Sequence, residues 1–132
     1  MLQTARFEPL NAFFDHIYVI TLERALERQE KIKKILNGLN YQFFFGSDKK
    51  NYAPDYFSAQ KIYDDNKAKR YHRYNKSMNA GQICCSWSHR NVYEDMLTKK
   101  YDRVLILEDD VVPIEEGLAS FQQIIDQLPP YW

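Results

Sequence analysis

The chain has 132 residues, which is the usual length of one domain and enough to bury a core. Hydrophobic residues make up 45% of it and aromatic residues 15%, a composition that excludes an intrinsically disordered chain. Because 18 basic residues balance 18 acidic ones, the net charge provides no general attraction for nucleic acids. We therefore expect a single globular domain over residues 1–132 whose function depends on local groups of charge.

The two cysteines, Cys84 and Cys85, are adjacent, and neighbouring cysteines form a disulfide only through a strained ring. Free thiols in a reducing compartment are therefore expected. The sequence contains no Cys-x-x-Cys pair or His cluster with the spacing of a structural zinc site. Residues 1–10 resemble neither a signal peptide nor a membrane anchor, and no apolar run reaches spanning length. These features predict a cytoplasmic protein, with peripheral contact to a membrane face left open.

The first third of the chain shows a strand, helix, strand pattern. Residues 14–22 are β-branched and aromatic, as in a strand, and Thr21 is placed to cap the element that follows. Apolar side chains then recur at helical spacing through residues 22–39. Residues 41–45 read as a second strand, which Gly46 ends. This order predicts two parallel strands joined by a right-handed crossover.

Residues 47–78 follow no period and include a basic, tyrosine-rich run from Lys67 to Lys76. We expect a long irregular excursion with one short helix, because such connections inside a compact domain usually act as a lid or a binding loop. The basic run also suits single-stranded nucleic acid, through phosphate contacts and stacking on tyrosine. An RNA-binding domain is therefore an alternative, although the chain is neutral and has no RNA-binding motif that we know.

The remainder predicts a helix, a strand and a helix. Residues 79–82 form a capping box that begins a helix reaching about Lys99, and its apolar side chains spread over more than one face, so we expect it to be largely enclosed. Residues 104–107 are apolar on both faces, which is typical of a central strand covered by helices. A last helix begins near Glu116, and the pair at 131–132 indicates the start of another strand.

Three carboxylates, Glu108, Asp109 and Asp110, directly follow the apolar strand at 104–107. Ligands of open α/β sheets collect at that edge, and neighbouring carboxylates are most simply compensated by a hard divalent metal bound through oxygen. A solvated acidic turn is the alternative. A receiver domain would need a long further stretch after the acids, and a haloacid-dehalogenase phosphatase would need Asp at position 108, so phosphoryl transfer is disfavoured.

Three separated segments match motifs of a known family in the right order. Residues 16–24, with Arg28, match an opening strand and an arginine-rich turn; residues 80–89 match a Gly-Glu-Ile-Gly-Cys-x-x-Ser-His helix; residues 105–111 match a Leu-Ile-Leu-Glu-Asp-Asp-Val strand. Together they resemble glycosyltransferase family 25. This family contains bacterial lipopolysaccharide-biosynthesis transferases and also includes collagen galactosyltransferases. The chain differs from the family pattern at Thr21, Gln82 and Cys84, where the family has Asn, Glu and Gly.

The resemblance implies an α/β domain of the GT-A, Rossmann-like type, with a mostly parallel sheet flanked by helices. It implies a metal-dependent transferase that moves a sugar, galactose being one candidate, from a UDP-sugar to a lipooligosaccharide or other glycan acceptor. Glu108 and Asp110 would hold Mn²⁺ or Mg²⁺. The donor-binding residues would be Thr21, Arg24, Arg28, Ser88, His89, Glu108 and Asp109.

Other roles stay open for some of these residues. The two arginines also suit a solvated helix face, and His89, on an apolar stripe, also suits a core position. Members of the family are longer than this chain, and no residue here can be assigned as the catalytic base. We therefore expect the donor-binding half of a transferase, incomplete on its own, with a non-catalytic donor-binding or protein-interaction module as the rival hypothesis.

Overall fold

The computed structural model describes residues 2–132, with side chains from Ala5 onward. Its elements alternate helix and strand, as the sequence predicts for an α/β chain. In order they are α1 (Leu2–Phe13), β1 (His16–Thr21), α2 (Leu26–Ile35), β2 (Tyr41–Phe45), η1 (Lys49–Asn51), α3 (Tyr56–Ala59), α4 (Asp65–Tyr71), α5 (Ala80–Lys99), β3 (Val104–Glu108) and α6 (Glu115–Asp126).

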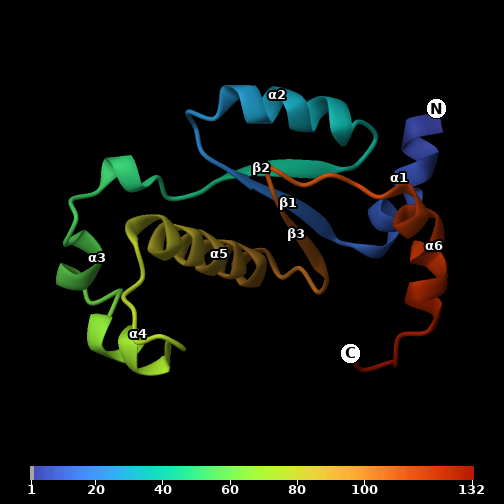
Figure 1. Cartoon of the computed structure of the whole chain (residues 1–132). Helices are drawn as coiled ribbons and strands as arrows, with labels where there is room; N and C mark the ends of the chain where they lie inside the picture. The colour runs from blue at the N-terminus through green and yellow to red at the C-terminus, as the bar shows by residue number, and fades with distance from the viewer. Residues whose placement is uncertain (1) are drawn as a thin grey trace.

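The three strands form one parallel sheet in the order β2-β1-β3 (Figure 1). Ile17 of β1 is in register with Tyr41 on one side and with Leu105 on the other. The central strand is therefore β1, whose residues 17–19 are at most 2% exposed. The expectation that residues 104–107 form a central strand is wrong for the described residues: β3 is at the edge of the sheet, and its apolar side chains are only half-buried.

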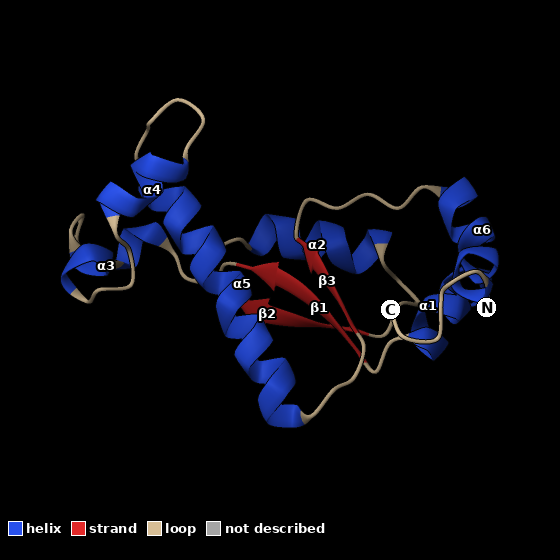
Figure 2. Ribbon diagram, turned by 90° about the horizontal axis from the view of Figure 1, so that it is seen from below, coloured by secondary structure: helices blue, strands red, loops and turns tan. Residues whose placement is uncertain are grey.

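Helices cover both faces of the sheet, with α2 on one face and α5 on the other (Figures 1 and 2). Because successive strand residues point to opposite faces, Ile17 and Val19 enter the core shared with α1 and α2. Tyr18 points the other way, and its hydroxyl donates a hydrogen bond to Asp95 of α5 at 2.7 Å. The predicted mixed α/β architecture with a parallel, helix-flanked sheet is thus confirmed.

Helix α5 is less enclosed than its sequence indicates. It buries only Cys84, Ser88 and Val92, whereas Leu97 is 74% exposed. The physical reason is the small sheet: a single layer of three strands covers one side of the helix and leaves the other side to solvent. The capping box is confirmed, because Asn79 accepts from the Gln82 amide and Gln82 accepts from the Asn79 amide.

No helix within residues 2–132 has the length and apolar character that a membrane span requires.

Helices α1 and α6 pack together beyond the amino ends of the strands (Figure 2). Phe13 contacts Phe121 edge to face, and Trp132 stacks on Phe13 at 5.6 Å between ring centroids. The prediction that residues 131–132 begin a strand is therefore wrong, because the ring of Trp132 packs against α1 instead. Helix α1 itself was not predicted, because Pro9 and its mixed polarity conceal its helical pattern.

The excursion over residues 47–78 contains η1, α3 and α4 rather than one short helix. Part of its basic charge is paired locally: Lys69 forms an ion pair with Asp65, and Arg73 and Lys76 lie over the ring of Tyr74. These contacts reduce the number of cations that face solvent freely.

Gly46 sets how closely the end of β2 approaches α5. Its amide donates to the Thr21 carbonyl at 2.8 Å, and a Cβ at this position would lie 2.6 Å from Ser88 Oγ. Ser88 cannot move away cheaply, because its hydroxyl donates to the Cys84 carbonyl and accepts from the Ser47 amide. Only glycine permits this approach, which brings residues 47–49 to the edge of the sheet.

We predict that Gly46→Ala lowers the free energy of unfolding by about 1–3 kcal/mol, the usual cost of overpacking. The measurement is urea denaturation followed by circular dichroism. Gly117→Ala in α6 is the control: its Cβ would meet nothing within 4 Å, and replacing a helical glycine should stabilise the protein by about 0.5–1 kcal/mol. Equal effects of the two substitutions would contradict the close approach at Gly46.

Candidate functional site

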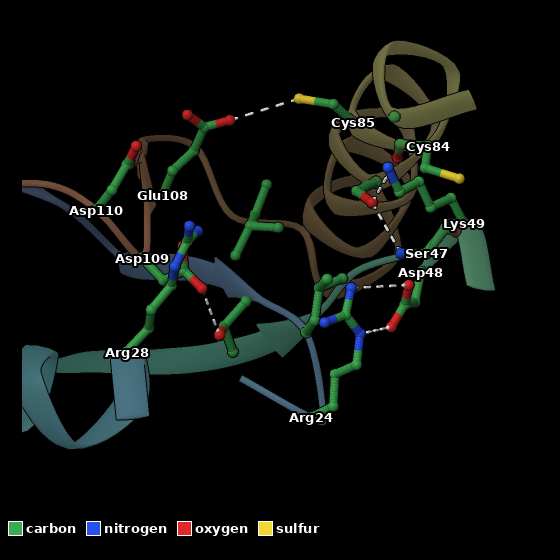
Figure 3. Close-up of a pocket in the computed structure, with 15 residues that line it drawn as sticks. Arg24, Arg28, Ser47, Asp48, Lys49, Cys84, Cys85, Glu108, Asp109 and Asp110 are labelled. Carbon is green, nitrogen blue, oxygen red and sulfur yellow. Dashed lines mark hydrogen bonds and ion pairs between the residues drawn. The ribbon is translucent and has the colours of Figure 1, made fainter. Parts of the chain in front are cut away.

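The carboxyl ends of the three parallel strands meet the beginning of α5 and enclose an open pocket of about 280 Å³ (Figure 3). This is the edge of an open α/β sheet where ligands collect. Its lining is rich in charged and hydroxyl side chains from four separate segments. The lining residues are Ile20, Thr21, Leu22, Arg24, Arg28, Ser47, Asp48, Lys49, Gly81, Cys84, Cys85, Ser88, Glu108, Asp109 and Asp110.

Asp109 is held by two partners in the pocket. Thr21 Oγ1 donates to its Oδ2 at 2.8 Å, and Arg28 Nη1 lies 3.2 Å from its Oδ1. The side chain of Asp109 is 10% exposed. The prediction that Thr21 caps the following helix is wrong: a turn separates it from α2, whose N-cap is Ala25 and has no side-chain cap. The Thr21 hydroxyl instead orients an acid of the triplet.

A second pair, Arg24 and Asp48, lies on the other side of the pocket. Arg24 donates to both carboxylate oxygens of Asp48 through Nε and Nη2, the latter at 3.3 Å. Asp48 also accepts the amide of Lys50 and so caps η1. The Arg24 guanidinium, and then the Lys50 amide, hold the pKa of Asp48 below its usual value. Because α2 begins at Leu26 and not at residue 22, Arg24 lies in the preceding turn, while Arg28 lies in the first helical turn.

Ser88 and His89 occupy different positions relative to the pocket. Ser88 lines it but is buried, and its hydroxyl is engaged by Ser47 and Cys84. His89 is not among the lining residues; its Nδ1 is 3.0 Å from the Cys85 carbonyl, one helical turn earlier. His89 is half-buried. It is therefore not the fully buried core histidine that its position on an apolar stripe suggested as an alternative to a donor-binding residue.

Glu108 and Asp110 extend to one side of the turn after β3, whereas Asp109 extends to the other (Figure 3). Glu108 and Asp110 are both exposed. Glu108 accepts a weak hydrogen bond from the Cys85 thiol at 3.5 Å, and Asp110 has no hydrogen bond or ion pair to any side chain described here. Burial, and then Glu108, raise the pKa of the Cys85 thiol. Exposed carboxylate oxygens without strong protein partners are the donor set that Mn²⁺ or Mg²⁺ prefers.

Of the eight lining residues that sequence reasoning did not assign to the site, four matter most for its chemistry: Ser47, Asp48, Lys49 and Cys85. The first three follow β2, and a signal for them existed. Once β1 and β2 are parallel, the residues after both strands must meet at one edge, as those after β1 and β3 do. Cys85 gave no such signal, because its proximity to Glu108 depends on how α5 crosses the sheet.

Comparisons with known proteins give one consistent result. The family model "Glycosyltransferase family 25 (LPS biosynthesis protein)" matches residues 14–131. A protein of Anopheles gambiae named "Glycosyltransferase 25 family member" is 36% identical over 104 residues, which are 73% of this chain and 16% of that protein. A protein of Drosophila melanogaster with the same name is 32% identical over 104 residues, again 16% of its length. No solved structure matches significantly.

The pairing of Arg24 with Asp48 predicts a pH-dependent stability. A carboxylate whose pKa is lower in the folded state stabilises the fold above its unfolded pKa, near 3.8, and loses that contribution as the pH falls through the folded value. We expect Asp48→Asn to be less stable than the wild type at pH 7, with the difference shrinking as the pH falls below 3.8. Urea denaturation across this range measures it.

Asp55→Asn is the matched control, because Asp55 is exposed and makes no side-chain cap at α3. Its stability difference should stay small at every pH. If the difference in the free energy of unfolding between the wild type and Asp48→Asn does not change with pH, the ion pair contributes nothing to folding.

Proposed function

The chain belongs to glycosyltransferase family 25, and from this premise we propose that its pocket binds the nucleoside diphosphate of a sugar donor. The reaction we propose is transfer of a sugar from a UDP-sugar, with galactose as a candidate, to a lipooligosaccharide or other glycan acceptor. The observation that carries the proposal is the charge of the pocket lining. The matching family is described as a lipopolysaccharide-biosynthesis protein, which supports this class of acceptor.

The charges that line the pocket nearly cancel but remain negative. Three cationic side chains, those of Arg24, Arg28 and Lys49, face four carboxylates, those of Asp48, Glu108, Asp109 and Asp110, so the formal charge is −1. This balance repels a diphosphate. One divalent cation changes the formal charge to +1, and an anionic ligand is then attracted. The pocket therefore supports a ligand that enters together with a metal ion.

The two arginines retain donors for phosphate oxygens. A guanidinium has five N–H donors. Arg24 uses Nε and Nη2 for Asp48, and Arg28 uses Nη1 for Asp109. The acids fix the direction of each guanidinium and leave further N–H groups directed elsewhere, which is the preorganised arrangement that phosphate binding favours.

Glu108 and Asp110 are the residues that would hold Mn²⁺ or Mg²⁺, because their carboxylates point the same way and are exposed (Figure 3). Such an ion supplies positive charge where the departing diphosphate becomes more negative as the glycosidic bond breaks. Asp109, fixed by Thr21 and Arg28, would accept hydrogen bonds from ribose or sugar hydroxyls.

The chain spans 16% of the length of the relatives it matches, so transfer itself is part of the proposal. No described residue is placed as a base opposite the leaving group. A non-catalytic donor-binding module remains the second reading of the same pocket, and a transferase assay with a donor and an acceptor separates the two. Both readings require the pocket to bind a nucleoside diphosphate.

We predict that UDP binds in the presence of Mn²⁺ and that binding is lost when EDTA is added. Glu108→Gln and Asp110→Asn should each weaken the Mn²⁺-dependent affinity at least about tenfold, because a charged ligand of the ion is removed. Isothermal titration calorimetry gives the dissociation constants.

Asp102→Asn is the matched control, since Asp102 is an exposed acid just before β3, at the opposite end of that strand. It should leave UDP binding unchanged. UDP binding of equal strength with and without metal would refute the metal part of the proposal, and no binding under either condition would refute the donor pocket.

A second prediction concerns Arg28. Removing its charge with Arg28→Gln should weaken Mn²⁺-dependent UDP binding about tenfold, the loss expected for a hydrogen bond to a charged group. Lys34→Gln, in the last turn of α2 and away from the pocket lining, should have no effect. If the two variants bind UDP equally well, Arg28 makes no contact with the diphosphate.

A further inference from the structure

Cys85, His89 and Glu108 form a compact cluster beside the pocket. One ligand atom from each residue lies within 4.8 Å of the other two. Cys85 Sγ is 3.5 Å from Glu108 Oε1 and 3.9 Å from His89 Nδ1. Within residues 2–132, as the structure describes them, no other set of three His, Cys, Asp or Glu side chains comes together in this way.

These separations suit tetrahedral coordination. Zinc bonds of about 2.0–2.3 Å place tetrahedral ligands roughly 3.3–3.8 Å apart, so the ligand atoms of Cys85, His89 and Glu108, which lie within 4.8 Å of one another, must move closer to share one ion. Binding through Nδ1 of His89 also requires that this nitrogen give up its contact with the Cys85 carbonyl. Cys85 and His89 are four residues apart on α5 and therefore lie on one face of that helix. Three protein ligands leave a fourth position open, and the cluster is accessible to solvent.

The identity of the ligands points to a different metal from the one proposed for donor binding. A thiolate and an imidazole favour Zn²⁺ and similar thiophilic ions, whereas Mn²⁺ and Mg²⁺ prefer oxygen alone. No sequence motif indicates this site, because two ligands come from a helix and the third from a strand end. That arrangement lacks the spacing of a four-ligand structural zinc site.

The neighbouring cysteine provides a built-in comparison. Cys84 is buried, and its sulfur points away from Glu108, whereas the sulfur of Cys85 points toward it (Figure 3). Adjacent thiols on one helix thus differ in whether they can reach the cluster. A metal bound through Cys85 should not depend on Cys84.

We propose that Cys85, His89 and Glu108 form a binding site for a thiophilic divalent ion of the Zn²⁺ class. The site uses the thiolate of Cys85, from which binding displaces the proton, one imidazole nitrogen of His89 and one carboxylate oxygen of Glu108. Because Glu108 is shared, occupation by Zn²⁺ withdraws this carboxylate from Mn²⁺. That consequence rests on the proposed donor pocket, whereas the Zn²⁺ site itself does not.

The test is a titration of the reduced protein with Co²⁺, a spectroscopic substitute for Zn²⁺. The wild type should develop a sulfur-to-cobalt charge-transfer band in the near ultraviolet, together with the intense visible bands of tetrahedral cobalt, and Zn²⁺ should remove both. Cys85→Ser should abolish the charge-transfer band, and His89→Gln should weaken Co²⁺ binding at least about tenfold. Cys84→Ala should retain the band.

Folding is checked by circular dichroism for each variant, and His89→Gln keeps the test valid if Cys85→Ser is unfolded. A wild-type protein without the band, or a band that survives in folded Cys85→Ser, would overturn the site. A charge-transfer band that is lost in folded Cys84→Ala but kept in Cys85→Ser would show that the ligand sulfur belongs to Cys84, and it would also overturn the proposed site.

Competition tests the sharing of Glu108. Added Zn²⁺ should reduce the Mn²⁺-dependent affinity of the wild type for UDP, and the reduction should be smaller in Cys85→Ser, measured against that variant's own affinity without Zn²⁺. Zinc that binds with the cobalt signature but leaves UDP affinity unchanged would show that the carboxylate is not shared. Because the Co²⁺ titration contains no nucleotide, failure of UDP binding and failure of the metal site are separate results.

Discussion

The parallel pairing of β1 with both of its neighbours is the constraint on which the rest of the structure depends. It places the ends of three strands at one edge of the sheet, and with them the residues that follow each strand. Ser47, Asp48 and Lys49 reach this edge because Gly46 lets β2 approach Ser88 closely. The pocket is thus a consequence of backbone pairing and of one steric requirement.

Charge is divided within the pocket according to burial. Asp48 and Asp109, each with a side chain that is 10% exposed, are paired with arginines, as poorly hydrated carboxylates require. Glu108 and Asp110 are exposed and make no ion pair with the described side chains. Residues adjacent in sequence have these different environments because the turn after β3 sends their side chains to opposite sides (Figure 3). The exposed pair can therefore accept a metal while Asp109 keeps Arg28 in place.

Much of this arrangement follows from the sequence alone. The strand patterns at residues 14–22 and 41–45 and the capping box at Asn79 predict the β-α-β unit and the start of α5, and the acids after β3 mark the edge where a ligand would bind. Local patterns could not give the strand order, so the apolar character of residues 104–107 suggested a central position that β1 in fact occupies. The partners of Thr21, Asp48 and Cys85 depend on tertiary packing, and Thr21 in particular was misread as a helix cap.

The most direct test of the account is where Mn²⁺ sits when UDP is bound, measured by paramagnetic broadening of amide resonances in the labelled protein. Broadening should be strongest for residues 108–110 and should extend to residues 21–28, 47–49 and 81–85, which line or adjoin the same pocket. Broadening centred on the basic run at residues 67–76, with the resonances of residues 108–110 unaffected, would contradict it.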